Sequence, residues 1–156
     1  MGTSNYQIIT PDKAYMFFPI QQMTEAKELD EETVKTMQAQ LDLHGGLFNY
    51  KEKGTAIELA GVEKVEGADA YKLKALYKNG KSTTFLIDKN TNRVVKTISK
   101  AKTPDGSETD METSFSDYKQ NADGYWFAYS NTTPNGPIVF DKIETNVKVD
   151  EKMFKN

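Results

Sequence analysis

The chain has 156 residues, of which 37% are hydrophobic and 28% charged, and its formal net charge is −3. This length suits one domain with a core, and the absence of cysteine excludes disulfides and thiolate chemistry. The 20 basic residues are scattered among 23 acidic ones without a basic block, so nucleic acid is not expected as a partner. No apolar run approaches the ~18 residues that a membrane-spanning helix requires, so no transmembrane segment is expected.

Two short strands are predicted near the N-terminus. Residues 6–10 and 14–18 are extended segments on either side of Pro11-Asp12, a dipeptide typical of turns. The second segment, which includes Phe17, is apolar on both faces. Such a run is ordinary for a strand buried on both sides, and it also fits a strand that faces a ligand or lies under a helix.

One amphipathic helix is predicted over residues 30–44. Asp30 is a suitable N-cap, and Gly45-Gly46 can end the helix. Its apolar side chains recur at helical spacing and therefore need another element to cover them. They are Val34, Met37, Leu41 and His44. His44, the only histidine, lies in the last turn, where a partly buried or dipole-compensating role is the common one.

Short extended segments separated by turn signals fill the chain from Thr55 onward. Six turns imply about seven strands, and Asn79-Gly80 predicts a two-residue hairpin. Alternation within the strands gives one continuous apolar face. Its members include Tyr71, Leu73, Ala75, Tyr77, Phe85, Ile87, Met111, Thr113, Phe115, Val139, Ile143, Val147 and Val149. We therefore expect one antiparallel sheet of about seven to nine strands, with the N-terminal pair included and the helix laid on it.

The sequence offers no constellation for catalysis or metal binding. A single histidine without cysteine gives neither a nucleophile–base pair nor a zinc site. Residues 88–92 resemble half of a calcium loop, but Arg93 stands where glycine is needed and Ser99 where a bidentate glutamate is needed. This run is therefore predicted to be a β-turn. No catalytic residue, metal ligand or cofactor is predicted, and a hydrolytic role is the weakest alternative.

Several segments resemble the outer-membrane lipoprotein-sorting (LolA/LolB-like) proteins of Bacteroidetes-type bacteria. They are the helix after Leu29 and residues 14–21, 47–54, 65–73, 85–88, 116–118 and 141–147. The resemblance implies a mainly β fold: a curved antiparallel sheet or incomplete β-barrel with one amphipathic helix packed on its concave face, where the carriers receive lipoprotein acyl chains. It also implies a periplasmic or outer-membrane-associated location. Residues 1–4 are expected to be a leader, and residues 5–156 a single domain that lacks the family's N-terminal strands.

Two functions follow from this interpretation. In the first, a non-enzymatic domain binds an apolar ligand such as a lipoprotein acyl chain, and the burial of apolar area provides the affinity. The predicted lining residues are Phe17, Met37, Leu41, Tyr71, Leu73, Phe85, Phe115 and Phe127, each of which would also suit a packed core. In the second, the domain is a docking module that pairs through an open sheet edge with another protein or with a second copy, as a homo-oligomer.

Overall fold

The computed structural model describes residues 5–103 and 106–154, and the contacts within the chain group into two compact units. The first unit is Met1–Gly45 with Lys148–Asn156, and the second is Gly46–Val147. Residues 1–4, the predicted leader, lie outside the described residues. The expectation of one domain over residues 5–156 stays a prediction.

A three-stranded antiparallel sheet forms part of the first unit. Its order is β1-β2-β3, with bounds β1 (Tyr6–Ile9), β2 (Ala14–Phe17) and β3 (Lys27–Glu28). The backbone N–H of Thr10 donates to the carbonyl of Lys13 at 2.8 Å and closes the predicted turn between the first two strands. The N-terminal strand pair is therefore confirmed. Two short 3₁₀ helices, η1 (Pro19–Gln21) and η3 (Glu151–Phe154), complete the regular elements outside the helical segment.

The expectation of one sheet that includes the N-terminal pair is wrong. The described residues contain ten strands divided between two sheets. Strand β2 pairs on its second edge with β3, where Tyr15 lies opposite Glu28 and Met16 opposite Lys27. A two-residue strand is too short to show a hydrophobic period, so residue pattern alone does not reveal β3 as a partner of β2.

The predicted helix begins where expected and ends early. Asp30 is the N-cap: its carboxylate accepts hydrogen bonds from the backbone N–H of Thr33 at 2.9 Å and from its hydroxyl at 2.8 Å. The α-helix α1 (Glu31–Met37) continues as a 3₁₀ helix, η2 (Gln38–Leu41), and stops there instead of at residue 44. The N–H of Gly45 donates to the carbonyl of Asp42 at 3.1 Å, so three-residue turns replace the α-helical bonds of the predicted last turn.

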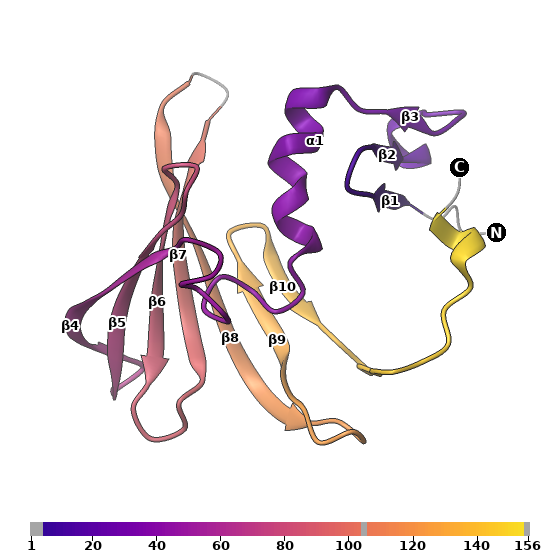
Figure 1. Ribbon diagram of the computed structural model, residues 1–156. Helices are drawn as coiled ribbons and strands as arrows, with labels where there is room; N and C mark the ends of the chain where they lie inside the picture. The colour runs from indigo at the N-terminus through magenta and orange to yellow at the C-terminus, as the bar shows by residue number, and fades with distance from the viewer. Residues whose placement is uncertain (1–4, 104–105, 155–156) are drawn as a thin grey trace. The chain divides into compact units, whose positions relative to one another are not determined.

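The second unit is a seven-stranded antiparallel meander (Figure 1). Its strands are β4 (Ala56–Val65), β5 (Ala68–Leu76), β6 (Ser82–Asp88), β7 (Val94–Lys102), β8 (Glu108–Gln120), β9 (Trp126–Thr133) and β10 (Gly136–Val139). Each strand pairs with its neighbours in the chain, which leaves β4 and β10 as the two edges of a twisted sheet that does not close. The predicted fold class, mainly β with an unclosed antiparallel sheet, is confirmed. The packing of the helix on that sheet stays a prediction.

The turn at Asn79-Gly80 is a hairpin turn of three residues instead of the predicted two. The N–H of Tyr77 donates to the carbonyl of Lys81, and the N–H of Gly80 donates to the carbonyl of Tyr77, both at 2.9 Å. Only Gly80 of the turn has a positive φ, at 79°. A two-residue type I′ turn needs positive φ at both central positions, so the chain uses a type I turn closed by a left-handed glycine.

Strand β10 ends at Val139, so the expectation that Ile143, Val147 and Val149 extend it is wrong. The expectation that Val139 lies on the apolar face is also wrong, because Val139 pairs with Ser130 and points to the opposite face from Ile138. Side-chain hydrogen bonds, and not backbone pairing with a neighbouring strand, hold the segment after β10 against the β8–β9 turn. The Asn121 amide donates to the Thr145 hydroxyl at 2.9 Å, and that hydroxyl donates to the Asp123 carboxylate. A segment fixed by side chains in this way does not need the regular backbone pairing of a strand.

Asp88 organises the turn between β6 and β7. Its Oδ1 accepts hydrogen bonds from the N–H of Asn90 at 3.1 Å, from the N–H of Thr91 at 2.7 Å and from the Thr91 hydroxyl at 2.8 Å. Residues 88–92, which resemble half of a calcium loop, therefore form a turn, and Asp88, their first residue, caps it. These bonds, the one from the Thr91 hydroxyl first, lower the pKa of the buried Asp88 carboxyl.

Arg93 and Trp126, the single arginine and the single tryptophan, stack beside this turn. The guanidinium carbon lies 3.8 Å from the Trp126 ring centroid and 5.4 Å from the Tyr118 ring centroid. The Tyr118 hydroxyl donates to the carbonyl of Val94 at 2.5 Å, and burial raises the pKa of that tyrosine. A cation on two aromatic rings therefore ties β7 to β8 and β9 at this end of the sheet.

The Asp88 turn predicts an acid-sensitive stability. Because the pKa of Asp88 is lower in the folded state, its carboxylate stabilises the fold fully above the unfolded pKa of ~3.9, and this contribution disappears as the pH falls through the folded pKa. Wild type should therefore be more stable than Asp88→Asn at pH 7, and the two should converge as the pH falls through the folded pKa. Urea unfolding across this range measures the difference. A gap that stays constant down to pH ~2 would contradict the assignment.

Candidate apolar binding face

The strand register gives the seven-stranded sheet one apolar face. Antiparallel partners point to the same side, and Leu59 lies opposite Leu73, which lies opposite Phe85. Counting in steps of two along each strand extends this row. The apolar face comprises Ile57, Leu59, Val62, Tyr71, Leu73, Ala75, Phe85, Ile87, Met111, Thr113, Phe115, Phe127, Tyr129, Asn131 and Ile138.

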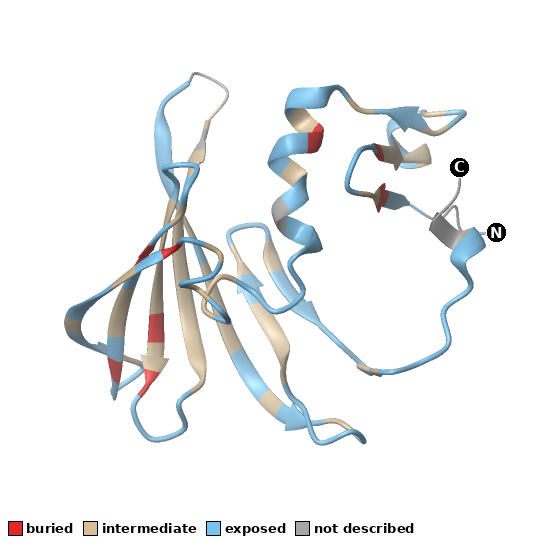
Figure 2. Ribbon diagram, in the orientation of Figure 1, coloured by how far each residue is buried: buried red, intermediate tan, exposed pale blue. Residues whose placement is uncertain are grey.

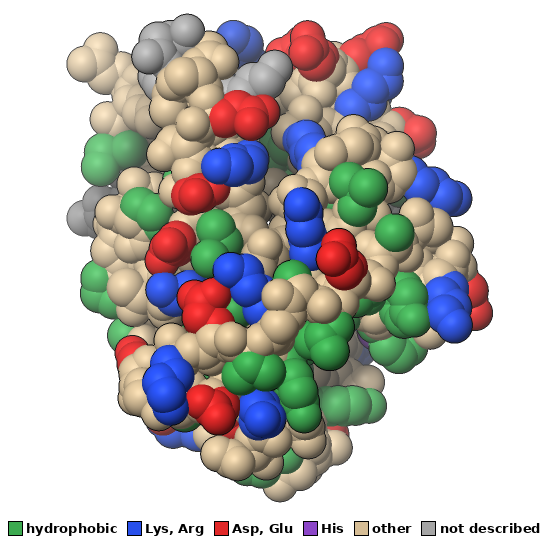
Figure 3. All heavy atoms as spheres, turned by 90° about the vertical axis from the view of Figure 1, so that its left-hand side faces the viewer, with side chains coloured by type: hydrophobic (Ala, Val, Ile, Leu, Met, Phe, Trp, Pro, Cys, Tyr) green, Lys and Arg blue, Asp and Glu red, His purple; other side chains and the backbone are tan. Residues whose placement is uncertain are grey.

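Ion pairs cover the opposite face of the same sheet. The Lys96 ammonium lies 2.9 Å from the Glu112 carboxylate, and further pairs join Lys72 to Glu63 and Lys100 to Asp110. Figure 3 shows one side of the molecule, where Lys and Arg side chains are interspersed with Asp and Glu. These charges stay at the water boundary, although the same face also contains the fully buried Leu86, which lies between Lys72 and Lys96 in the ladder.

Burial along the apolar face falls towards the β4 edge. Phe85, Phe115 and Phe127, in the interior strands, are half-buried, and Ala75 is fully buried. By contrast, Leu59 is 62% exposed and Val62 is 54% exposed, and Figure 2 shows most of β4 as exposed. Tyr71, opposite Val62 on β5, is 38% exposed. A contiguous patch of exposed apolar side chains is uncommon on a soluble protein unless it contacts something.

Five of the eight predicted lining residues share the apolar face. They are Tyr71 and Leu73 on β5, Phe85 on β6, Phe115 on β8 and Phe127 on β9. Register alone brings them together, because a chain of opposite partners leads from Leu73 through Thr97 and Thr113 to the strand of Phe115.

The other three predicted lining residues lie in the first unit. The Phe17 ring packs against Tyr6, with ring centroids 5.3 Å apart. Met37 is half-buried at the end of α1, and Leu41 is exposed at the end of η2. Their place beside the other five, and the contact of any of the eight with a ligand, stay predictions.

Sequence reasoning missed several residues of the apolar face, and the bulge in β4 explains why Leu59 and Val62 were among them. The others are Ile57, Tyr129, Asn131 and Ile138. Strand β4 contains a bulge at Gly61, where the register shifts by one residue and φ is 127°. Leu59 and Val62 are three positions apart, an odd spacing that would put them on opposite faces of a regular strand. The bulge moves them to the same face, so a search for strict alternation does not find them. A glycine inside a strand pattern was the signal that would have found them.

The apolar face also contains polar side chains: Thr97 and Thr113 lie on it, and Lys119 lies opposite Phe127. Among the described residues, Asn131 differs from these in having a buried oxygen without a donor. Asn131 lies in β9, opposite Phe115 on one side and Ile138 on the other. Its Oδ1 is buried, and within residues 5–103 and 106–154 no protein donor reaches it. A buried acceptor without a donor costs about 1–3 kcal/mol, so this position is unfavourable in the isolated sheet.

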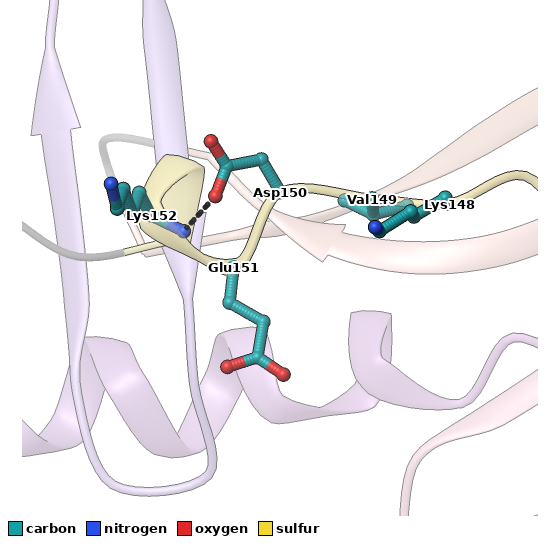
Figure 4. A pocket seen from close by; sticks show the side chains of 5 residues that line it. All are labelled: Lys148, Val149, Asp150, Glu151 and Lys152. Atoms are coloured by element: carbon teal, nitrogen blue, oxygen red, sulfur yellow. Dashed lines mark hydrogen bonds between the residues drawn. The ribbon is translucent and has the colours of Figure 1, made fainter.

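A hollow of about 680 Å³ opens beside the C-terminal segment (Figure 4). The described residues that line it are consecutive: Lys148, Val149, Asp150, Glu151 and Lys152. The Asp150 carboxylate accepts a hydrogen bond from the N–H of Lys152 at 3.0 Å. Charged side chains dominate this lining, and none of the eight predicted residues belongs to it.

The described part of the chain contains no group of three or more His, Asp or Glu residues placed to hold a metal ion. Within the same residues, no helix is long and apolar enough to span a membrane. The chemistry that the apolar face offers is mainly apolar contact, together with the buried, unsatisfied oxygen of Asn131.

Comparison with solved structures confirms, at the level of the fold, the predicted likeness to lipoprotein-sorting proteins. An outer membrane lipoprotein-sorting protein domain from Vibrio parahaemolyticus superimposes with a TM-score of 0.55 at 20% identity, over 94% of this chain and 65% of that one. A DUF1329 family protein from Desulfovibrio piger gives 0.57 at 16% identity, over 96% and 66%. A LolA superfamily protein from Nitrosomonas europaea gives 0.52 at 10% identity, over 97% and 70%.

The chain thus spans about two thirds of the length of the first two of these structures. No protein-family model matches the sequence, and no curated protein matches it. At these identities the likeness establishes the fold alone. The expected origin among Bacteroidetes-type bacteria stays a prediction.

The gradient of burial predicts different costs for two leucines of the apolar face. Leu73→Ala should lower the free energy of unfolding by about 2 kcal/mol or more, because it removes a half-buried side chain from the middle of a ladder. Leu59→Ala should change it by less than ~0.5 kcal/mol, because the side chain is exposed. Urea unfolding of both variants measures the contrast. Equal losses would show that the folded chain already covers Leu59.

Proposed function

We propose that this chain is a non-catalytic binding domain whose apolar face holds an apolar ligand such as a lipoprotein acyl chain, in the periplasm or at the outer membrane. The observation that carries the proposal is the exposed group of Leu59, Val62 and Tyr71 on an unclosed sheet. Burying a fully exposed apolar side chain of this size contributes about 1.5–3 kcal/mol, and each of these partly exposed side chains can contribute a corresponding fraction. Apolar contact alone can therefore supply useful affinity, and no covalent step is required.

The shape of the apolar face suits an extended chain. Leu59, Leu73 and Phe85 lie opposite one another on three successive strands, so they form a row across the sheet. Neighbouring strands are ~4.8 Å apart, which places successive side chains of the row within reach of one extended alkyl chain. The solved structures that share the fold include a lipoprotein-sorting protein domain, which supports a lipid-bearing ligand over a compact polar one.

A charge introduced on the apolar face should weaken ligand binding. Tyr71→Asp should raise the Kd for a fluorescent fatty acid at least about tenfold, because it removes apolar contact and buries a charge in the complex. The matched control is Leu76→Asp, on the same strand but on the charged face, where the native side chain is 49% exposed. Fluorescence titration of both variants measures the difference.

The control variant should bind like wild type. A wild-type protein that never binds the probe would end the lipid-binding proposal. Equal weakening by Leu76→Asp would show that the probe does not use the apolar face.

Docking through a sheet edge is the second candidate, and the two edges differ in their fitness for it. The N–H of Phe140 donates to the carbonyl of Tyr129 at 2.9 Å, so the alternation of the ladder turns the nitrogen of Pro137 away from β9. Proline has no N–H to offer a further strand, so β10 is a protected edge. Strand β4, with ten residues, offers the longer free edge for a partner or for a second copy.

If the β4 edge pairs with a second copy, the molar mass should rise with concentration towards that of a dimer. Size-exclusion chromatography with light scattering over a wide concentration range measures this directly. A constant monomer mass up to millimolar concentration would remove the homo-oligomer and leave the apolar-ligand proposal in place.

A further inference from the structure

Asn131 has the one buried side-chain acceptor without a hydrogen-bond donor among the described residues, and it lies on the apolar face. Within the described ladder its partners on that face are Phe115 on β8 and Ile138 on β10. Its Oδ1 is buried, and no donor in the described part of the protein satisfies it. Buried polar groups in folded proteins are nearly always hydrogen-bonded, so an orphan of this kind calls for an explanation.

The position itself does not require an amide. Asparagine is disfavoured in strands, and β-branched residues of similar size suit a half-buried strand position better. An apolar side chain at residue 131 would also remove the cost of the unsatisfied acceptor. The sheet therefore gains nothing visible from Asn131, which is the pattern expected of a residue that acts towards a ligand.

Access to Asn131 is available from the edge of the sheet. Its partner Ile138 belongs to the four-residue edge strand β10 and is 50% exposed. Exposed side chains change rotamer within nanoseconds, so a ligand that lies across β8, β9 and β10 can move Ile138 aside. Asn131 would then meet the ligand with an acceptor already stripped of water.

We propose that Asn131 selects an acyl ligand that carries a hydrogen-bond donor beside its acyl carbonyl, an amide-linked chain instead of an ester-linked one, with Oδ1 of Asn131 accepting from the ligand N–H. This inference rests on the proposed function, because it assumes that the chain lies on the apolar face. The acceptor is the part of the side chain that lacks a partner, so a donor on the ligand is the complementary group. An ester presents only acceptors and leaves Oδ1 unsatisfied in the complex.

Two matched lipids test the selection. N-palmitoylglycine carries an amide N–H, and the corresponding palmitoyl ester of glycolic acid has oxygen in its place, with the same chain and the same carboxylate. Each competes with a bound fluorescent fatty acid. Wild type should bind the amide about three- to tenfold tighter than the ester, the range of one net hydrogen bond.

The variant Asn131→Leu should lose this preference, or reverse it, and should still bind the ester within about twofold of wild type. The matched control is Thr132→Leu, the next residue of β9, which points to the charged face and is exposed. It should keep the wild-type preference for the amide.

Each outcome has a distinct meaning. If wild type binds neither lipid, the proposed function fails, and this inference fails with it. If wild type binds both lipids equally, or if Asn131→Leu keeps the preference, this inference fails while the proposed function stands. A thermal melt accompanies the titration: Asn131→Leu should melt at or above the wild-type temperature, and a clearly lower value would show that the native amide is already paired and would overturn the premise.

Discussion

In an antiparallel sheet that does not close, the charged face is stable in water, whereas the apolar face is stabilised by contact with other apolar groups. The proposed functions of this protein depend on that difference. In the second unit the charged face is satisfied by ion pairs between neighbouring strands, such as Lys96 with Glu112. The apolar face becomes less covered towards β4, where Leu59 and Val62 stand exposed. The binding proposals for this chain follow from that uncovered surface, because apolar area exposed to water is a source of free energy for association.

Side-chain contacts fix the turns at one end of the seven-stranded sheet. Asp88 caps the β6–β7 turn, Arg93 stacks on Trp126 beside it, and the Asn121–Thr145 bond fixes the segment after β10 to the β8–β9 turn at the same end of the sheet. These contacts order the turns at that end of the sheet. Strands β4 and β10 stay unpaired with each other, and the apolar face stays exposed towards β4.

The sequence predicted the features that depend on local chemistry. Turn residues located the strands, Asp30 located the start of α1, and alternation placed Tyr71, Leu73 and Phe85 on one face. The wrong predictions concern features that are determined by contacts distant in the sequence or by local irregularities of a strand. The two-residue strand β3 draws the N-terminal strands into their own sheet, and the bulge at Gly61 hides Val62 from the alternation pattern. Asn131 was not singled out because a lone polar residue in a strand is ordinary until its neighbours and its missing donor are known.

The central claim is that an acyl chain lies on the apolar face of the seven-stranded sheet. Methyl NMR of leucine- and valine-labelled protein, titrated with palmitate, tests it most directly. The account predicts shift changes at Leu59, Val62 and Leu73, and unchanged signals from Leu76 and Leu86 on the charged face. Shift changes confined to the charged face, or no changes at saturating palmitate, would contradict it.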